Sequence, residues 1–189
     1  MSNISNETIF LRHLSSTLAA AHDLTDWRHH LSLHFKHSSG RMLHQIIFCP
    51  DDIPAKLIPG WDTYICPQPH QVAGKPSLTD IPWVYWAVLD IDPLPGANTS
   101  IHVQLPTFAA EIDSLLGIPQ LSWVYIFTGR GAQLWLPISP SRPSILRDLQ
   151  HTLNIRGVFH SLNHAGWSID PTCFEASHIF RLPGTTNSK

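Results

Sequence analysis

Three aspartates are the side chains in this sequence with the clearest capacity for chemistry. Asp90-Ile91-Asp92 directly follows an apolar run at residues 84–89, and Asp170 stands far downstream. Residues i and i+2 of a β-strand point to the same face, so the carboxylates of Asp90 and Asp92 should project together. Two neighbouring carboxylates repel each other unless a cation lies between them. The pair therefore predicts a divalent-metal site, the alternative being two solvated acids at a strand end.

A glycine-containing turn is the second candidate site. Thr128-Gly129-Arg130-Gly131-Ala132-Gln133 joins two short apolar segments, 123–127 and 132–136, which predicts a β-hairpin. Glycine lets the backbone approach an anion closely, and the forked guanidinium of Arg130 suits a phosphate group. Thr128 and Gln133 add neutral hydrogen-bond donors. The turn therefore indicates phosphate binding, with a plain hairpin turn as the alternative.

The last segment of the sequence is the third candidate site. Arg181-Leu182-Pro183-Gly184-Thr185-Thr186-Asn187-Ser188-Lys189 follows Asp170. A third acid could complete a two-metal site, and Arg181 and Lys189 could balance the charge of a triphosphate. Taken alone, an aspartate before a proline is more typical of a turn.

Taken in this order, the three sites resemble the archaeo-eukaryotic primase superfamily, most closely the small primase-polymerases of plasmids, phages and mobile elements. The resemblance covers about residues 81–189, and the Arg-Leu-Pro-Gly-Thr-x-Asn-x-Lys segment is its most specific part. It implies an α+β fold, with an RRM-like palm whose mostly antiparallel sheet is flanked by helices and carries out catalysis on its surface. Residues 1–80 would form a small N-terminal α/β lobe of the same catalytic domain.

The resemblance also implies roles for individual residues. Asp90, Asp92 and Asp170 would be the catalytic residues and the ligands of two divalent cations, Mg²⁺ or Mn²⁺. The nucleotide and its triphosphate would be bound by Thr128, Gly129, Arg130, Gly131, Gln133, Arg181, Asn187 and Lys189. Gln133 stands where a histidine is common, and glutamine cannot carry positive charge. This departure weakens the expected triphosphate binding, and Arg130 is the candidate compensation.

The implied function is that of a DNA primase/polymerase. Such a nucleotidyltransferase makes or extends primers on single-stranded DNA from nucleoside triphosphates during replication. A downstream helical domain or a replicative helicase would be a further partner. Two alternatives stay open: a non-catalytic nucleic-acid-binding replication-initiator module, and an end-filling repair polymerase that shares the metal site.

Composition narrows the class of protein. Of the 189 residues, 43% are hydrophobic and only 14% are charged, which argues against disorder and coiled coil. Residues 1–119 carry six Lys/Arg against eleven Asp/Glu, whereas residues 120–189 carry six against three, so a phosphate-binding surface is expected in the C-terminal part. The three cysteines form no CxxC pair, which disfavours a structural zinc site. With no long apolar run or signal peptide, an intracellular, cytoplasmic protein without a membrane partner is expected.

The spacing of apolar residues and the positions of proline and glycine predict the helices and strands. Helices are expected over 6–22, 26–36, 99–116 and 143–164, and strands over 45–49, 61–66, 84–89, 123–127, 132–136, 167–170 and 179–182. Residues 67–82, rich in proline and glycine, are expected to form an exposed loop. His30, His34 and His37 fall at helical spacing and are interpreted as surface histidines. Most tryptophans are assigned to the core.

Overall fold

The chain folds into two compact units. The computed structural model describes residues 30–50, 53–97, 101–116, 123–128 and 131–182, and parts of 10–21. Unit 1 comprises Met1–Tyr85, Ser139–Pro143 and Ala176–Lys189, and unit 2 comprises Trp86–Ile138 and Ser144–Glu175. The assignment of residues 1–80 to a lobe and 81–189 to a palm stays a prediction.

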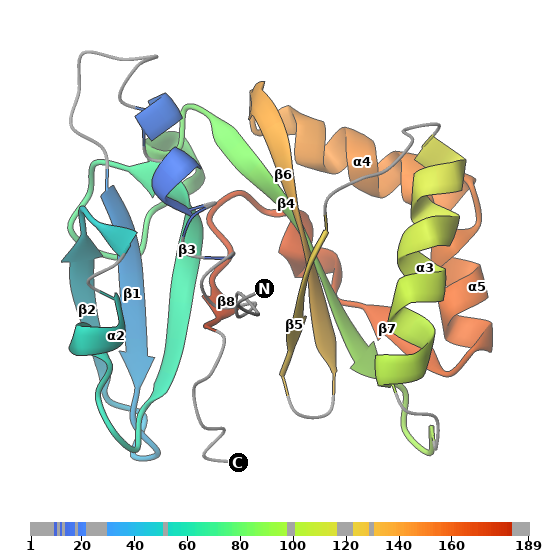
Figure 1. Ribbon diagram of the computed structural model, residues 1–189, viewed down its shortest axis with the longest axis horizontal. Coiled ribbons are helices and arrows are strands. Elements are labelled where there is room, and N and C mark those ends of the chain that lie inside the picture. Colours follow the sequence, from blue (N-terminus) through green and yellow to red (C-terminus); the bar gives the residue numbers. More distant parts are fainter. Residues whose placement is uncertain are drawn as a thin grey trace, which may run out of the picture. The chain divides into compact units, whose positions relative to one another are not determined.

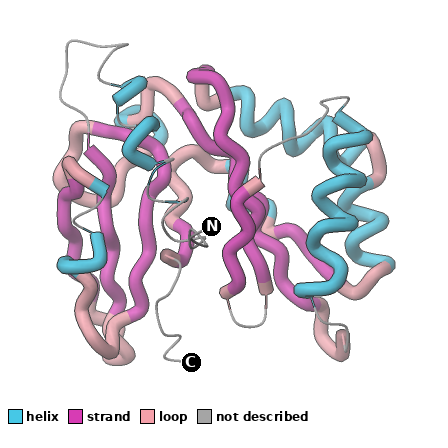
Figure 2. The backbone as a smooth tube through the Cα atoms, viewed as in Figure 1, coloured by secondary structure: helices cyan, strands magenta, loops and turns pink. Residues whose placement is uncertain are grey.

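Unit 1 is built on a four-stranded sheet of order β2-β1-β3-β8 (Figures 1 and 2). Its strands are β1 (His30–Lys36), β2 (Met42–Ile47), β3 (Asp62–His70) and β8 (Phe180–Arg181), and their pairings are antiparallel. The short helices α2 (Ile53–Lys56) and η2 (Leu78–Asp80) lie in the connections. The described residues of the N-terminal segment are helical, as predicted for 6–22, and they bury Phe10, Leu14, Thr17 and Ala21.

Unit 2 contains the second sheet, of order β5-β6-β4-β7, with helices on one of its sides (Figure 1). Its elements are β4 (Val84–Pro93), α3 (Ile101–Leu116), β5 (Val124–Phe127), β6 (Ala132–Ser141), α4 (Ser144–Ile155), α5 (Val158–His164), β7 (Trp167–Ile169) and η3 (Pro171–Phe174). This strand–helix–strand–strand–helix–strand succession, with the first strand between the third and the fourth, is the split βαβ arrangement of RRM-like domains. The α+β prediction, including an RRM-like sheet flanked by helices, is therefore confirmed.

Aromatic packing fixes the centre of unit 2. Trp86 on β4 and Trp135 on β6 are fully buried, and their rings meet edge to face with centroids 5.7 Å apart. This is a favoured geometry for aromatic pairs because the positive ring edge meets a negative face. The assignment of Trp86 to the core is confirmed, and Trp135, which could equally have faced the sheet surface, lies in the core as well. Within the described residues, no helix is both long and apolar enough to cross a membrane.

The helix predicted over 26–36 is wrong where the structure describes it. Residues 30–36 form β1, which lies between β2 and β3 and has six of its seven residues buried. Leu31, Leu33 and Phe35 alternate with polar residues at the period of a strand, and tertiary pairing on both sides overrides the coincident helical spacing of the histidines. His30 and His34 are accordingly buried, not on the surface.

Other boundaries also differ from prediction. The first part of the expected exposed loop is strand, because β3 continues through Pro67 and Pro69 to His70, and these residues are buried. The pairing of β1 with β3 shifts register between His30 and Ser32, which accommodates prolines that cannot donate to the ladder. The single helix expected over 143–164 is two, since Gly157 adopts a left-handed conformation between α4 and α5.

A buried row of polar side chains crosses the sheet of unit 1. Ser32 Oγ lies 2.8 Å from His34 Nε2 and 2.9 Å from His70 Nε2, and His34 Nδ1 lies 2.7 Å from His44 Nδ1. Ser32, His34 and His70 are each fully buried, so these hydrogen bonds replace the water that the groups lose on folding. The two imidazole nitrogens 2.7 Å apart share one proton, so they cannot both carry one at the same time.

The row makes stability depend on pH. Burial, followed by the charges of His44, His70 and Lys75, lowers the pKa of His34 to about 4. Because the unfolded chain takes up the proton near its ordinary pKa of about 6.5, stability present above that pH is lost as the pH falls toward 4, by about 3 kcal/mol. We expect His34→Gln to flatten this dependence in urea unfolding, whereas the exposed His160→Gln should keep it. An equal slope in both variants would contradict the assignment.

Candidate metal and nucleotide site

The acid pair lies at the end of β4. The six residues from Val84 to Leu89 are buried, after which Asp90 is half-buried, Ile91 is buried and Asp92 is exposed. Strand alternation places Asp90 and Asp92 on the same face, as predicted. The apolar part of the strand is fixed by the core, so it delivers both carboxylates to one edge of that core.

Asp170 is placed opposite Asp90 by strand register. In the antiparallel pairing of β4 with β7, Ile91 faces Ile169, and Asp170 N donates to Asp90 O at 2.9 Å just beyond the ladder. Asp170 also caps η3, where its Oδ1 accepts from Thr172 N at 2.8 Å and from Thr172 Oγ1 at 2.7 Å. These bonds hold the carboxylate in one orientation, and both use Oδ1. Within the described part of the chain, Oδ2 is thus left for a cation.

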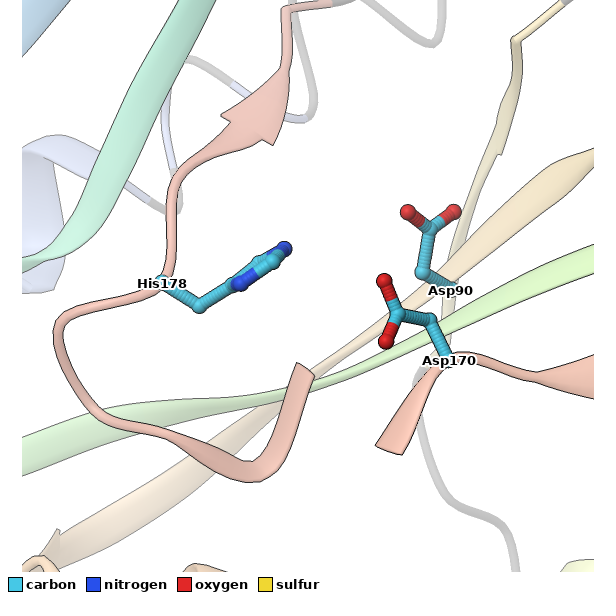
Figure 3. Close-up of side chains that lie close together, drawn as sticks. All are labelled: Asp90, Asp170 and His178. Atoms are coloured by element: carbon cyan, nitrogen blue, oxygen red, sulfur yellow. The ribbon is translucent and has the colours of Figure 1, made fainter. Parts of the chain in front are cut away.

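The carboxylates of Asp90 and Asp170 lie side by side (Figure 3), with an oxygen of each within 4.8 Å of the other. At this separation, two full charges in a site of effective dielectric constant about 20 repel by about 3 kcal/mol. Asp92 does not join these two acids in a described group whose ligand atoms all lie within 4.8 Å. Its partner across the β4–β7 ladder is Ser168, not an acid. The structure therefore brings two of the three predicted ligands together.

His178 is a residue that the sequence interpretation did not single out. It stands eight residues after Asp170, belongs to unit 1, and is also drawn in Figure 3. Within unit 1 its ring meets that of Phe180 edge to face, with centroids 4.7 Å apart. A single histidine followed by an apolar residue carries no sequence signal of its own, and short separation along the chain from Asp170 was the one clue available.

The buried thiol of Cys173 lies near the acid pair. Cys173 on η3 is buried, and burial raises the pKa of its thiol, which the nearby charges of Asp90 and Asp170 raise further. The thiol therefore stays protonated at neutral pH and offers no thiolate to a metal. The donors that this part of unit 2 presents are carboxylate oxygens, the ligands of Mg²⁺ and Mn²⁺ rather than of zinc.

The predicted hairpin is confirmed, and it packs against the acid strand. β5 and β6 pair antiparallel with Phe127 opposite Ala132, and Thr128 N donates to Gly131 O at 3.1 Å across the turn. A Cβ on Gly131 would lie 2.3 Å from Ile91 O and 2.7 Å from Asp92 Oδ1. Glycine is thus required because β6 begins directly against the backbone of β4. Gly129 and Arg130 lie outside the described residues.

Gln133 is not exposed at the surface, where a phosphate-binding side chain would be expected. Its side chain is buried, and its Oε1 accepts from Trp135 Nε1 at 3.1 Å. Both residues lie on the same face of β6, two positions apart. In this geometry the amide oxygen is committed to the indole, so a role of Gln133 in phosphate binding stays a prediction.

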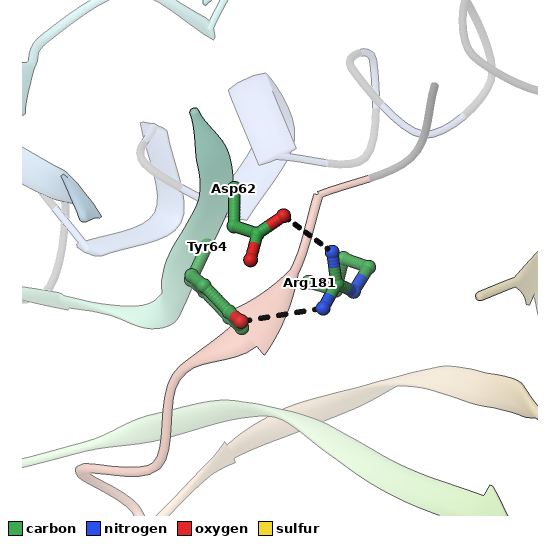
Figure 4. A network of polar contacts seen from close by, with 3 residues as sticks. All are labelled: Asp62, Tyr64 and Arg181. Atoms are coloured by element: carbon green, nitrogen blue, oxygen red, sulfur yellow. Dashed lines mark hydrogen bonds and ion pairs between the residues drawn. The ribbon is translucent and has the colours of Figure 1, made fainter. Parts of the chain in front are cut away.

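Arg181 is held by two residues of β3 (Figure 4). Its Nη1 lies 3.3 Å from Asp62 Oδ1 in an ion pair, and its Nη2 donates to Tyr64 Oη at 3.3 Å. Tyr64 faces Arg181 across the β3–β8 ladder, and the guanidinium carbon lies 5.2 Å from the centre of its ring. The side chains of Arg181 and Asp62 are 14% and 6% exposed, so the guanidinium has little freedom. Asn187 and Lys189 lie outside the described residues.

The contact of Gly131 with β4 predicts the effect of a single methyl group. Gly131→Ala should force β6 away from Ile91 and Asp92, with a loss of about 1–3 kcal/mol in the free energy of unfolding. Gly74→Ala is the matched control, because nothing lies within 4 Å of a Cβ there. Urea unfolding of both variants measures the difference, and equal stabilities would show that β6 does not press on the acid strand.

Comparisons with known proteins give one match, and it concerns the fold. No family model matches the chain, and no curated protein matches it. Among solved structures, the polymerase domain of Mycobacterium tuberculosis ligase D, in complex with DNA, matches 98% of this chain and 77% of its own, with a TM-score of 0.56 and 12% sequence identity. At this identity the match shows a shared fold. The chain therefore has an α+β fold similar to that of a DNA polymerase domain.

Proposed function

We propose that this protein is a metal-dependent DNA polymerase of the primase-polymerase type, which adds nucleotides from nucleoside triphosphates to a strand on a single-stranded DNA template. The observation that carries the proposal is the opposition of Asp90 and Asp170 on neighbouring antiparallel strands. Like charges directly opposite each other destabilise a sheet. A fold that holds them there is best explained by a cation that they bind.

The donor set fits Mg²⁺ or Mn²⁺. Asp90 and Asp170 would hold the cations, and Asp92, two residues along the same face, would complete the ligand set with water. When bound, divalent cations in such sites neutralise the triphosphate and lower the pKa of the attacking 3′-hydroxyl.

The residues of the chain itself would bind and orient. The caps from Thr172 keep the Asp170 carboxylate fixed, so no reorganisation is needed when charge develops. Arg181, oriented by Asp62 and Tyr64, would contact the triphosphate, with Thr128, Gly129, Arg130, Gly131, Gln133, Asn187 and Lys189 as the further proposed contacts. Primer synthesis in replication, with a helical domain or helicase as partner, is the finer form of the proposal and rests on the sequence resemblance.

Removing one charge of the acid pair should have opposite effects on the stability of the metal-free protein and on its activity. Asp170→Asn keeps an oxygen for the Thr172 hydrogen bonds but removes a charge, so the metal-free protein should be as stable as the wild type or more stable. Mn²⁺ about 100-fold above its dissociation constant should raise the wild-type Tm by about 5 °C or more, but not that of the variant. Incorporation of labelled nucleotides on single-stranded DNA should be abolished by Asp170→Asn and by Asp90→Ala.

The exposed Asp148→Asn on α4 is the matched control and should behave as the wild type in both assays. Running the reaction with and without a primer separates primer synthesis from extension. Metal-dependent products in Asp90→Ala or Asp170→Asn would refute the metal site. Absence of products from every protein, with DNA binding retained, would instead favour a non-catalytic binding module.

Arg181 and its ion pair predict an effect on nucleotide affinity. Removing the guanidinium in Arg181→Ala should raise the apparent Michaelis constant for nucleotide about tenfold, since a charge-assisted hydrogen bond to phosphate is lost. Asp62→Asn should raise it less, by loosening the guanidinium, with kcat nearly unchanged. Tyr64→Phe removes only one neutral partner and serves as the control. Both charge variants should be checked by near-ultraviolet circular dichroism, and an unchanged Michaelis constant in folded Arg181→Ala would remove this residue from the triphosphate site.

A further inference from the structure

A concave site lies in unit 2 on the helices, outside the acid pair. An open depression of the surface, with a volume of about 340 Å³ and called the cavity below, is lined by Arg147, Gln150, His151 and Asn154 of α4 and by Phe159 of α5. Gln150, His151 and Asn154 come three, four and seven residues after Arg147, so the four residues share one face of α4. The volume lies in the range of small-molecule sites, which run from about 300 to 1,000 Å³.

The lining combines three chemistries. Arg147 is exposed and makes no ion pair or hydrogen bond with any other described residue, and no acidic side chain lines the cavity. An unpaired guanidinium in a hollow surface suits a phosphate group, which it can contact with two parallel hydrogen bonds. His151 stands one helical turn along and can donate to the same anion.

The side-chain amides of Gln150 and Asn154 and the ring of Phe159 are suited to the base of a nucleotide. Gln150 and Asn154 each present a donor and an acceptor, the pair of groups that reads the edge of a base. Phe159 is half-buried, and its ring packs at 59° against Phe174 with centroids 6.1 Å apart. This contact holds one side of the ring in place while the cavity exposes it to a ligand, and stacking on such a ring tolerates any base.

We propose that the cavity between α4 and α5 is a second nucleotide-binding site, which takes a nucleoside phosphate, free or as one unit of a single strand. Arg147 and His151 bind the phosphate, Gln150 and Asn154 contact the base edge, and Phe159 stacks on the base. A solvated helix face explains the charged and amide residues, but it does not explain why they line the same depression as an aromatic ring. The site is separate from the acid pair and needs no metal.

Binding is tested on the full chain in EDTA and at low salt, which removes any metal-dependent binding of phosphate at the acid pair. The probe is a fluorescein-labelled oligothymidylate of about 12 nucleotides, followed by fluorescence anisotropy. Arg147→Ala should weaken binding about tenfold. Arg156→Ala, which removes the same charge just past the end of α4 but does not line the cavity, should change it by less than about twofold.

Base recognition is tested by two further variants. Phe159→Leu and Gln150→Ala should each weaken the oligonucleotide about fivefold, and neither should change competition by inorganic phosphate. Gln150→Ala lies away from the Phe159–Phe174 contact and therefore decides the question if Phe159→Leu fails to fold. Displacement of the probe by thymidine monophosphate identifies a free nucleotide as sufficient, and displacement only by unlabelled oligothymidylate identifies a strand.

Three outcomes would overturn the proposal: no binding by the wild type, equal losses in the Arg147 and Arg156 variants, and full oligonucleotide affinity in Gln150→Ala together with folded Phe159→Leu. Asp170→Asn should retain the binding measured in EDTA. A protein that binds the probe in this way but incorporates no nucleotide would separate failure of the polymerase proposal from failure of this one.

Discussion

The register between β4 and β7 is the constraint on which the candidate site depends. It sets Asp170 opposite Asp90, although the two residues are distant in the sequence and their like charges oppose that placement. Burial of Trp167 and Ile169, which alternate with Ser168 on β7, fixes the register from the apolar side, since a slip of one residue would turn them away from the core. The hydrophobic core therefore sustains a charge arrangement that would not form in its absence.

Unit 1 also buries charged and polar groups, and there the partners are other side chains of the same sheet. Its sheet buries polar groups in pairs and rows: Arg181 against Asp62, and Ser32 between two histidines. The partners in these pairs match in chemistry, which makes the arrangement tolerable but conditional. Loss of one partner leaves the other desolvated. The polar residues of unit 1 thus keep their geometry only while their protonation states are kept.

How far the sequence predicts this structure depends on the range of the interactions. The face shared by Asp90 and Asp92, the hairpin at 128–131 and the buried tryptophans follow from local alternation and turn chemistry, and all are observed. The ion pair of Arg181 with Asp62 cannot be predicted from local sequence, because Asp62 comes 119 residues earlier and the two residues meet only through the sheet. β1 was misread because its histidines also fit a helical period, although Leu31, Leu33 and Phe35 carried the strand signal.

The short helix η3 connects the two candidate binding features of unit 2. Its first cap is the Asp170 carboxylate, and its last residue, Phe174, packs on Phe159 at the cavity of α4 and α5. Phe174 comes four positions after the cap, and Cys173 of the same turn is buried beside Asp90. Phe159 therefore packs on the same turn that Asp170 caps. The packing of α5 on η3 and the orientation of the Asp170 carboxylate therefore depend on one short turn.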